Sequence, residues 1–300
     1  MHEHPQISRQ RFLSVTVLNA VITLAEIIGG LMAGSLALLS DAVHNLTDTL
    51  SIVLGYVASR ISTRPENQYQ TYGYRRAEIL AALLNAIILV IVVIGLLYEA
   101  IVRFAHPEPI NGPLMLTVAI IGLIANIVSL FLLHAGVNHS LNLKATYLHI
   151  LGDTLSSVAV IIGALVVTLT QVTWVDPALT ILVALLIAKE TLPVIKQASL
   201  ILMQTGPKVD YDQITKDLTA LPGVNHIHHL HAWMLDEHTT AISLHINCTN
   251  QELSQIEPLY QQIETILKTK YHFNHVTIQA ECHRGEAESL IANEIDHFEH

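Results

Sequence analysis

Six long apolar stretches in the first two-thirds of this 300-residue chain constrain its fold more than any other feature. Each exceeds the roughly 20 residues that a helix needs to cross the hydrocarbon core of a bilayer. They cover approximately residues 11–34, 38–60, 76–105, 113–138, 144–171 and 176–203. The chain is 51% hydrophobic and only 13% charged, whereas soluble proteins average about 25% charged residues. We therefore predict a membrane all-α bundle of six transmembrane helices over residues 11–205.

The basic residues that flank these stretches predict the orientation of the bundle. One side carries Arg9, Arg11, Arg60, Arg64, Arg75, Arg76, Lys144 and Lys208, and the other side carries only Arg103. By the positive-inside rule, the N-terminal segment 1–10 and the C-terminal domain are cytoplasmic. The short chain has no long His-rich connection between its fourth and fifth spans, which favours a multi-pass protein of a bacterial inner membrane.

From Gly206 the sequence changes to that of a water-exposed α+β domain. We expect a helix, two strands, a helix and a strand at Asp210–Leu221, Val224–Met234, Thr239–Asn247, Glu252–Tyr271 and His275–Ala280. This αββαβ order predicts a ferredoxin- or metallochaperone-like domain over 206–284, with two helices covering one face of a small sheet. The acidic residues 285–300 are expected to be disordered.

Charge and histidine are concentrated in this C-terminal part. Residues 206–300 hold 14 of the 25 acidic residues, 5 of the 15 basic residues and 11 of the 18 histidines. Such acidity argues against nucleic acid as a partner, because nucleic acid requires a basic surface, and it suits a domain that handles cations. The two cysteines, Cys248 and Cys282, have no CxxC spacing and fit a reducing compartment.

One motif, His-x-Leu-x-Asp-Thr-Leu-Ser, occurs twice, beginning at His44 in the second span and at His149 in the fifth. On a helix, residues at i and i+4 lie on the same face, so His44 stands beside Asp48 and His149 beside Asp153. Two such helices facing each other would offer two imidazoles and two carboxylates, enough for tetrahedral coordination of Zn²⁺.

Each pair could instead be a hydrogen bond within one helix of a polar bundle. A charged group at membrane depth costs about 2.5–3.5 kcal/mol or more, however, and two repeated pairs favour metal or proton handling. Two aspartates neutralise a divalent cation, and the emptied site would attract protons, so we predict exchange of metal for protons. Asp41, one turn before His44, would line the pathway or cap its helix.

The elements Ser40-Asp41-x-x-His44-x-x-x-Asp48 and His149-x-x-x-Asp153 resemble those of the cation diffusion facilitators. The stretch from Gly29 to Asp41 is similar to the family's connection between the first and second spans, and the resemblance extends from about residue 10 to residue 282. The version with two histidines resembles the zinc-selective branch. The resemblance implies a homodimer that exports zinc from the cytoplasm by antiport with protons.

The family resemblance also implies a metal site in the cytoplasmic domain, at His228, His245 and Glu281. These residues belong to three strands that can be neighbours in one sheet, and Zn²⁺ accepts imidazole and carboxylate ligands. The alternative is a set of exposed polar histidines on an edge strand. Cys282 and His283 follow Glu281 directly and could add a second site.

The connection between the second and third spans departs from some members of that family. They hold a further metal site there, but this chain has no carboxylate or imidazole between Glu66 and Glu78. We predict that this site is absent. Arg75 and Arg76 are interpreted as an anchor at the cytoplasmic membrane surface.

The sequence thus predicts a secondary active transporter rather than an enzyme. It contains no nucleophile–base arrangement, phosphate-binding loop or dinucleotide motif. A passive metal channel and a membrane-anchored zinc sensor or scaffold stay open as alternatives. Nitrogen and oxygen ligands favour Zn²⁺, although Cd²⁺ and Co²⁺ would also fit.

Overall fold

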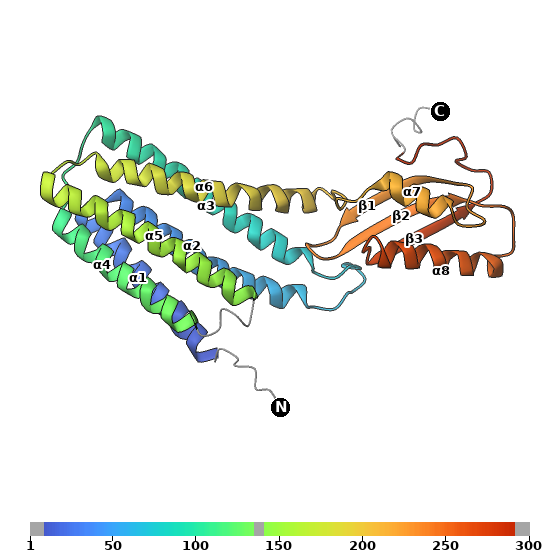
Figure 1. The fold of residues 1–300 in the computed structure, drawn as a ribbon, viewed down its shortest axis with the longest axis horizontal. Helices are drawn as coiled ribbons and strands as arrows, with labels where there is room; N and C mark the ends of the chain where they lie inside the picture. The colour runs from blue at the N-terminus through green and yellow to red at the C-terminus, as the bar shows by residue number, and fades with distance from the viewer. Residues whose placement is uncertain (1–8, 135–140, 292–300) are drawn as a thin grey trace. The chain divides into compact units, whose positions relative to one another are not determined.

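The computed structural model describes residues 9–134 and 141–291, and its chain divides into two compact units. One unit contains residues 1–58 and 81–195, and the other contains residues 59–80 and 196–300. Six long helices precede a small α+β domain (Figure 1). They are α1 (Arg9–Ala33), α2 (Leu36–Ser62), α3 (Arg76–Ala105), α4 (Gly112–His134), α5 (Leu141–Thr170) and α6 (Val175–Leu202).

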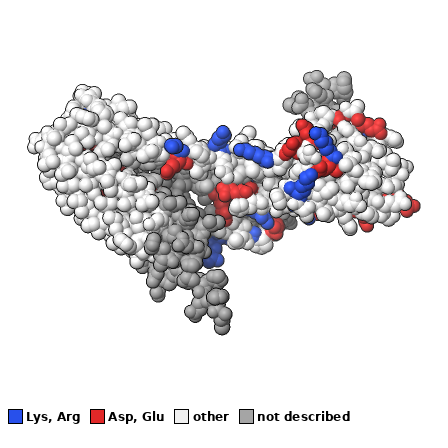
Figure 2. Space-filling view, viewed as in Figure 1, with Lys and Arg blue, Asp and Glu red and all other residues white. Residues whose placement is uncertain are grey.

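The helices α3, α4, α5 and α6 each contain a segment long and apolar enough to cross a membrane. In α1 the described apolar segment is shorter, Val17–Ala33, and α2 is interrupted by Asp41, His44 and Asp48. A membrane helical domain is therefore confirmed for four spans. On the face shown in Figure 2, charged residues gather over the C-terminal domain, whereas the surface of the helical bundle is mostly white.

Two apolar clusters hold the helical bundle together. The first joins α1, α2, α4 and α5 through small residues such as Ala37, Ala119 and Ala164, which let the helix backbones approach closely. The second joins α3 to α6, with Val93 and Ala184 at its centre. The first cluster thus packs α2 and α5, the two helices that contain the repeated His/Asp motif, against α1 and α4.

Hydrogen bonds between polar side chains add to this packing. Each joins two helices: Asn19 Nδ2 to Thr49 Oγ1 at 3.4 Å, Asn45 Nδ2 to Glu26 Oε2 at 3.0 Å, Asn85 Nδ2 to Ser51 Oγ at 2.6 Å and Asn126 Nδ2 to Ser157 Oγ at 3.2 Å. In a lipid environment such side chains have no water to bond with, so they act as contacts between helices. Three of the four bonds end on α2.

The start of α2 is capped by a side chain from α6. Asp176 is fully buried, and its carboxylate accepts hydrogen bonds from the Ser35 hydroxyl and from the amides of Leu36 at 2.8 Å and Ala37 at 3.2 Å. These amides are among the first-turn donors that a helix cannot satisfy internally. The capping role considered for Asp41 therefore belongs to Asp176.

We expect Asp176→Ala to lower the free energy of unfolding by about 2–3 kcal/mol, because it removes a charged acceptor from buried amides. Detergent-purified protein titrated with a denaturing detergent measures the change. Asp176→Asn keeps one acceptor oxygen and should lose less. Equal stability of both variants and the wild type would contradict the cap.

The C-terminal domain contains the expected α+β elements in the expected order. They are α7 (Tyr211–Thr219), β1 (His226–Met234), β2 (Thr240–Asn247), α8 (Leu253–Thr269) and β3 (His275–Glu281). The sheet order is β1-β2-β3, with β1 and β2 antiparallel and β2 and β3 parallel. Alternate residues of β2, Ile242, Leu244 and Ile246, are fully buried in one core with Ile214 of α7 and Ile263 of α8. Both helices thus cover one face of the sheet.

Part of the acidic C-terminal segment contacts β1, and the disorder expected for residues 285–300 stays a prediction. The Leu290 carbonyl accepts a bond from the Leu230 amide at 2.8 Å, and the Glu288 carbonyl lies 2.9 Å from His226 Nε2. The reason is that β1 lies at one edge of the sheet, where backbone amides directed away from β2 need hydrogen-bond partners. Residues 292–300 lie outside the described part of the chain.

The connection between α2 and α3 contacts the turn between β1 and β2, within the second unit. Arg75 Nη1 donates to Thr239 Oγ1 at 3.1 Å and lies 3.5 Å from Asp236 Oδ2. Arg76 Nη2 donates to the Met234 carbonyl at 3.4 Å. The interpretation of this basic pair as a membrane anchor missed these protein contacts, because they form only when distant segments meet.

Candidate metal centres

The repeated motif places its side chains at one point between α2 and α5. His44 Nε2 lies 3.8 Å from Asp48 Oδ2 on its own helix and 3.4 Å from Asp153 Oδ1 on α5. One ligand atom from each of the three lies within 4.8 Å of the others. The backbone of His149 lies in α5, one turn before Asp153, but its side chain falls outside the described residues. The metal-ligand role of all four stays a prediction.

This group, called the helical site below, is partly buried, and each of its three side chains keeps some exposed surface. The exposed fractions are 14% for the His44 side chain, 26% for Asp48 and 11% for Asp153. One imidazole nitrogen and two carboxylates are donors that Zn²⁺ prefers. Two carboxylates this close in a low-dielectric setting need a cation or protons between them. The helical site is therefore suited to hold a divalent cation and to release it in exchange for positive charge.

Asp41 lies beside the helical site and has its own partners. It is 3% exposed, and its carboxylate accepts hydrogen bonds from Ser156 Oγ at 3.2 Å and Ser157 Oγ at 3.5 Å. Both serines belong to α5, so this contact fixes the spacing of α2 and α5 close to Asp153. Its predicted role as a pathway residue stays a prediction.

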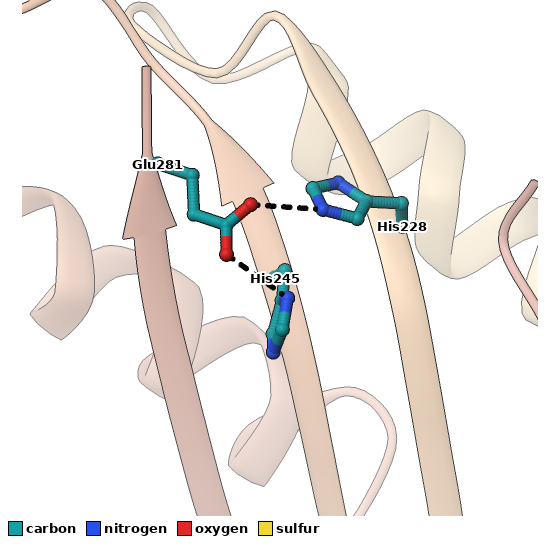
Figure 3. A group of neighbouring side chains, drawn as sticks. All are labelled: His228, His245 and Glu281. Atoms are coloured by element: carbon teal, nitrogen blue, oxygen red, sulfur yellow. Dashed lines mark hydrogen bonds and ion pairs between the residues drawn. The ribbon is translucent and has the colours of Figure 1, made fainter. Parts of the chain in front are cut away.

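A second group brings together the ends of three strands (Figure 3). Glu281 Oε2, at the end of β3, lies 3.1 Å from His228 Nε2 of β1, and its Oε1 lies 3.3 Å from His245 Nδ1 of β2. His228 and His245 are paired directly in the register of β1 and β2. One carboxylate therefore bridges two imidazoles, and the donor atoms again lie within 4.8 Å of one another.

A β-bulge orients the histidines of β1. The register shifts between His228 and His231, and His229 has a φ of 50°. The extra residue lets Ile227 and Leu230 both join the core, while His228 is directed toward His245. The ring of His229 stacks on that of His245, with 4.5 Å between centroids. Strand alternation alone could not have predicted this arrangement.

The surroundings of this second group, called the strand site below, bury His228 and favour the neutral form of His245. The His228 side chain is only 1% exposed, and its Nδ1 is buried with no hydrogen-bond partner within the described part of the chain. Gly285, at a φ of 70°, closes over this ring, and a Cβ there would lie 2.0 Å from Nε2. Burial lowers the pKa of His245 and outweighs the opposing attraction of Glu281. A neutral imidazole is the form that binds metal.

Cys282 and His283 do not join the strand site. Cys282 is a half-buried free thiol. The His283 side chain is 91% exposed, and its Nδ1 lies 3.0 Å from Glu286 Oε1. Among the described residues, the structure gathers neither of them into a group of metal-ligand type.

One residue near the helical site was missed by the sequence analysis. Glu190 of α6 lines a cavity of about 360 Å³ together with His44 and Asp153. Its position could have been noticed in the sequence, because a charged residue inside an apolar span is a candidate functional residue.

A helical membrane domain with a His/Asp group between two helices, followed by an α+β domain with a His/Glu group, defines a carrier for metal cations. Comparison with known families agrees. Residues 12–203 match the cation efflux transmembrane domain, and residues 207–283 match the cation efflux protein cytoplasmic domain. The chain belongs to the cation efflux family of membrane transporters.

Relatives that match nearly the whole chain carry transporter names. The metal cation efflux system protein CzcD of Cupriavidus metallidurans is 37% identical over 95% of this chain and 92% of its own length. The zinc transporter ZitB of Escherichia coli is 38% identical over 91% and 88%. The cadmium, cobalt and zinc/H(+)-K(+) antiporter of Bacillus subtilis is 33% identical over 97% and 94%. The protein is accordingly a transporter and not an enzyme.

We expect Glu281→Gln to weaken zinc binding at the strand site by at least about tenfold, because it removes the carboxylate that bridges the two histidines. Calorimetric titration of the full chain in detergent, with Asp153→Asn to disable the helical site, measures this. Glu286→Gln, which changes an exposed carboxylate bonded to His283, should have no effect. Equal losses in both variants would contradict the site.

Proposed function

We propose that this protein exports Zn²⁺ from the cytoplasm in exchange for protons, through a domain of six membrane-spanning helices with cytoplasmic termini. The observation that carries the proposal is the convergence of His44, Asp48 and Asp153 from two helices at one point inside the bundle. The second histidine of the repeat, His149, completes the proposed set of four ligands. Relatives from bacteria support a bacterial inner membrane as the location.

The exchange follows from the charges of the site. With zinc bound, the two aspartates balance the charge of the cation. After zinc leaves, His44 lies between two carboxylates at 3.8 and 3.4 Å, and the group binds protons because an unpaired anion is unfavourable in this environment. Protons and zinc therefore compete for the same atoms. Inward movement of the protonated site and outward movement of the zinc-loaded site produce antiport.

The choice of zinc follows from the ligand types. Imidazole nitrogen with carboxylate oxygen suits Zn²⁺ in tetrahedral geometry, and Cd²⁺ and Co²⁺ can occupy such a site. The names of these relatives include zinc, cadmium and cobalt, which supports the same substrates for this chain. The Bacillus subtilis relative is named as an H(+)-K(+) antiporter, and this name supports exchange with protons. We propose Zn²⁺ as the main substrate.

The strand site is proposed to hold a resident zinc ion. His228, His245 and Glu281 would bind it, and the buried Nδ1 of His228 and the bridging carboxylate fit such an ion. The ion would tie the ends of three strands together. The matching cytoplasmic family is named ZT_dimer, which supports a homodimer formed through this domain.

We expect zinc uptake into proteoliposomes to increase several-fold when the lumen is more acidic than the medium, because outward protons then drive zinc inward. A zinc-sensitive dye in the lumen records the initial rate, and an ionophore that dissipates the proton gradient is the control. Zinc flux that is the same with and without the gradient would indicate a passive pathway. Single-channel currents would indicate a channel.

We expect Asp153→Asn to reduce the transport rate at least about tenfold while zinc stays bound at the strand site. The substitution removes a charged ligand of the helical site and keeps the shape of the side chain. Transport and zinc content are measured on the same preparation. Asp212→Asn, at an exposed position in α7, is the control. Unchanged transport in Asp153→Asn would contradict the helical site as the transport site, and a wild type without zinc transport would indicate a sensor or scaffold.

A further inference from the structure

The cavity of about 360 Å³ beside the helical site has an unexplained acidic residue in its wall. Its α5 side contains Gly152, Asp153, Leu155, Ser156 and Ala159, and its α6 side contains Leu182, Val183, Leu186, Ile187 and Glu190. His44 of α2 completes the wall. Glu190 lines this cavity and is exposed.

Glu190 stands at one end of this cavity. Only a short connection joins α5, which ends at Thr170, to α6, which begins at Val175, so the two helices run antiparallel. Glu190 is therefore level with Gly152 and Asp153, while Leu182 is level with Ala159. Beyond Glu190, α6 continues toward the C-terminal domain. Among the α6 residues that line the cavity, Glu190 is the nearest to the C-terminal end of that helix.

Glu190 shares the cavity without belonging to the ligand group. The atoms that lie within 4.8 Å of one another come from His44, Asp48 and Asp153 only, within the described residues. The remainder of the α6 wall is aliphatic. The electric field of an anionic group on an apolar wall is concentrated in the cavity, because low-dielectric walls focus field lines. This field attracts cations into the cavity. Such an anionic group is costly at membrane depth without a partner, and it marks a candidate position on an ion pathway.

We propose that Glu190 is a capture site for the divalent cation. Its carboxylate binds the hydrated cation at the mouth of the cavity and passes it to His44 and Asp153 as water ligands are replaced. This assignment rests on the proposed transport function of the helical site and adds the route by which the cation reaches it. Because the contribution of Glu190 is electrostatic, it raises the rate at which the cation associates with the protein, and added salt weakens this effect.

The test is stopped-flow binding of Co²⁺ to the full chain in detergent, followed by the visible absorption of tetrahedral cobalt. A common Glu281→Gln substitution suppresses the strand site. We expect Glu190→Gln to slow Co²⁺ association about tenfold at low ionic strength, with the final spectrum unchanged. The difference from the parent protein should shrink as salt is added. Glu190→Asp, which keeps the charge, should recover most of the rate.

The matched control is Glu108→Gln, the same chemical change at a 59% exposed acid outside the cavity, and it should leave the rate unchanged. Equal association rates for Glu190→Gln and Glu108→Gln would overturn the proposal. A changed final spectrum would overturn it too, because Glu190 would then be a ligand of the helical site. Since binding is measured without a membrane, failure of proton-coupled transport in proteoliposomes would refute the proposed function and leave this result intact.

Discussion

The helical domain depends on one constraint, which is that a carboxylate inside a membrane needs a partner. Asp48 and Asp153 lie beside the same imidazole of His44. Asp41 accepts bonds from two hydroxyls of α5, and Asp176 accepts the first amides of α2. Each partnership joins two helices or two turns, so satisfying the charges also positions α2 against α5 and α6. Asp48 and Asp153 have an imidazole as partner, which is itself a metal ligand, whereas Asp41 and Asp176 accept hydrogen bonds from hydroxyl and amide groups.

The strand site applies the same chemistry in a different setting. Glu281 is held between His228 and His245 by three adjacent strands, and Gly285 closes the site from above His228. Three adjacent strands hold the ligands of the proposed resident ion, whereas two helices hold those of the proposed transported ion. The helix that contains His44, α2, is followed by the connection to α3. Arg75 of this connection contacts the turn between β1 and β2.

Much of this was predictable from local pattern. The spacing of His44 and Asp48 places both on one helix face, and its repetition in the fifth apolar stretch predicts a shared site. Apolar periodicity also predicts the αββαβ order. The orientation of His229 was not predictable, because a β-bulge changes strand alternation. The contact of Leu290 with the edge of β1 was not predictable either, because it depends on an unpaired backbone amide of that strand.

By itself, the sequence determined the apolar helices, the C-terminal α+β domain and the residue types that can bind a cation, because helix period, strand alternation and side-chain chemistry are local properties. Only the tertiary structure decided which distant groups meet. It assigned the cap of α2 to Asp176, placed Arg75 against the C-terminal domain and brought Glu190 into the cavity of His44 and Asp153. The first two are contacts between residues more than 100 positions apart in the chain, and all three arrangements form through packing that no local pattern encodes.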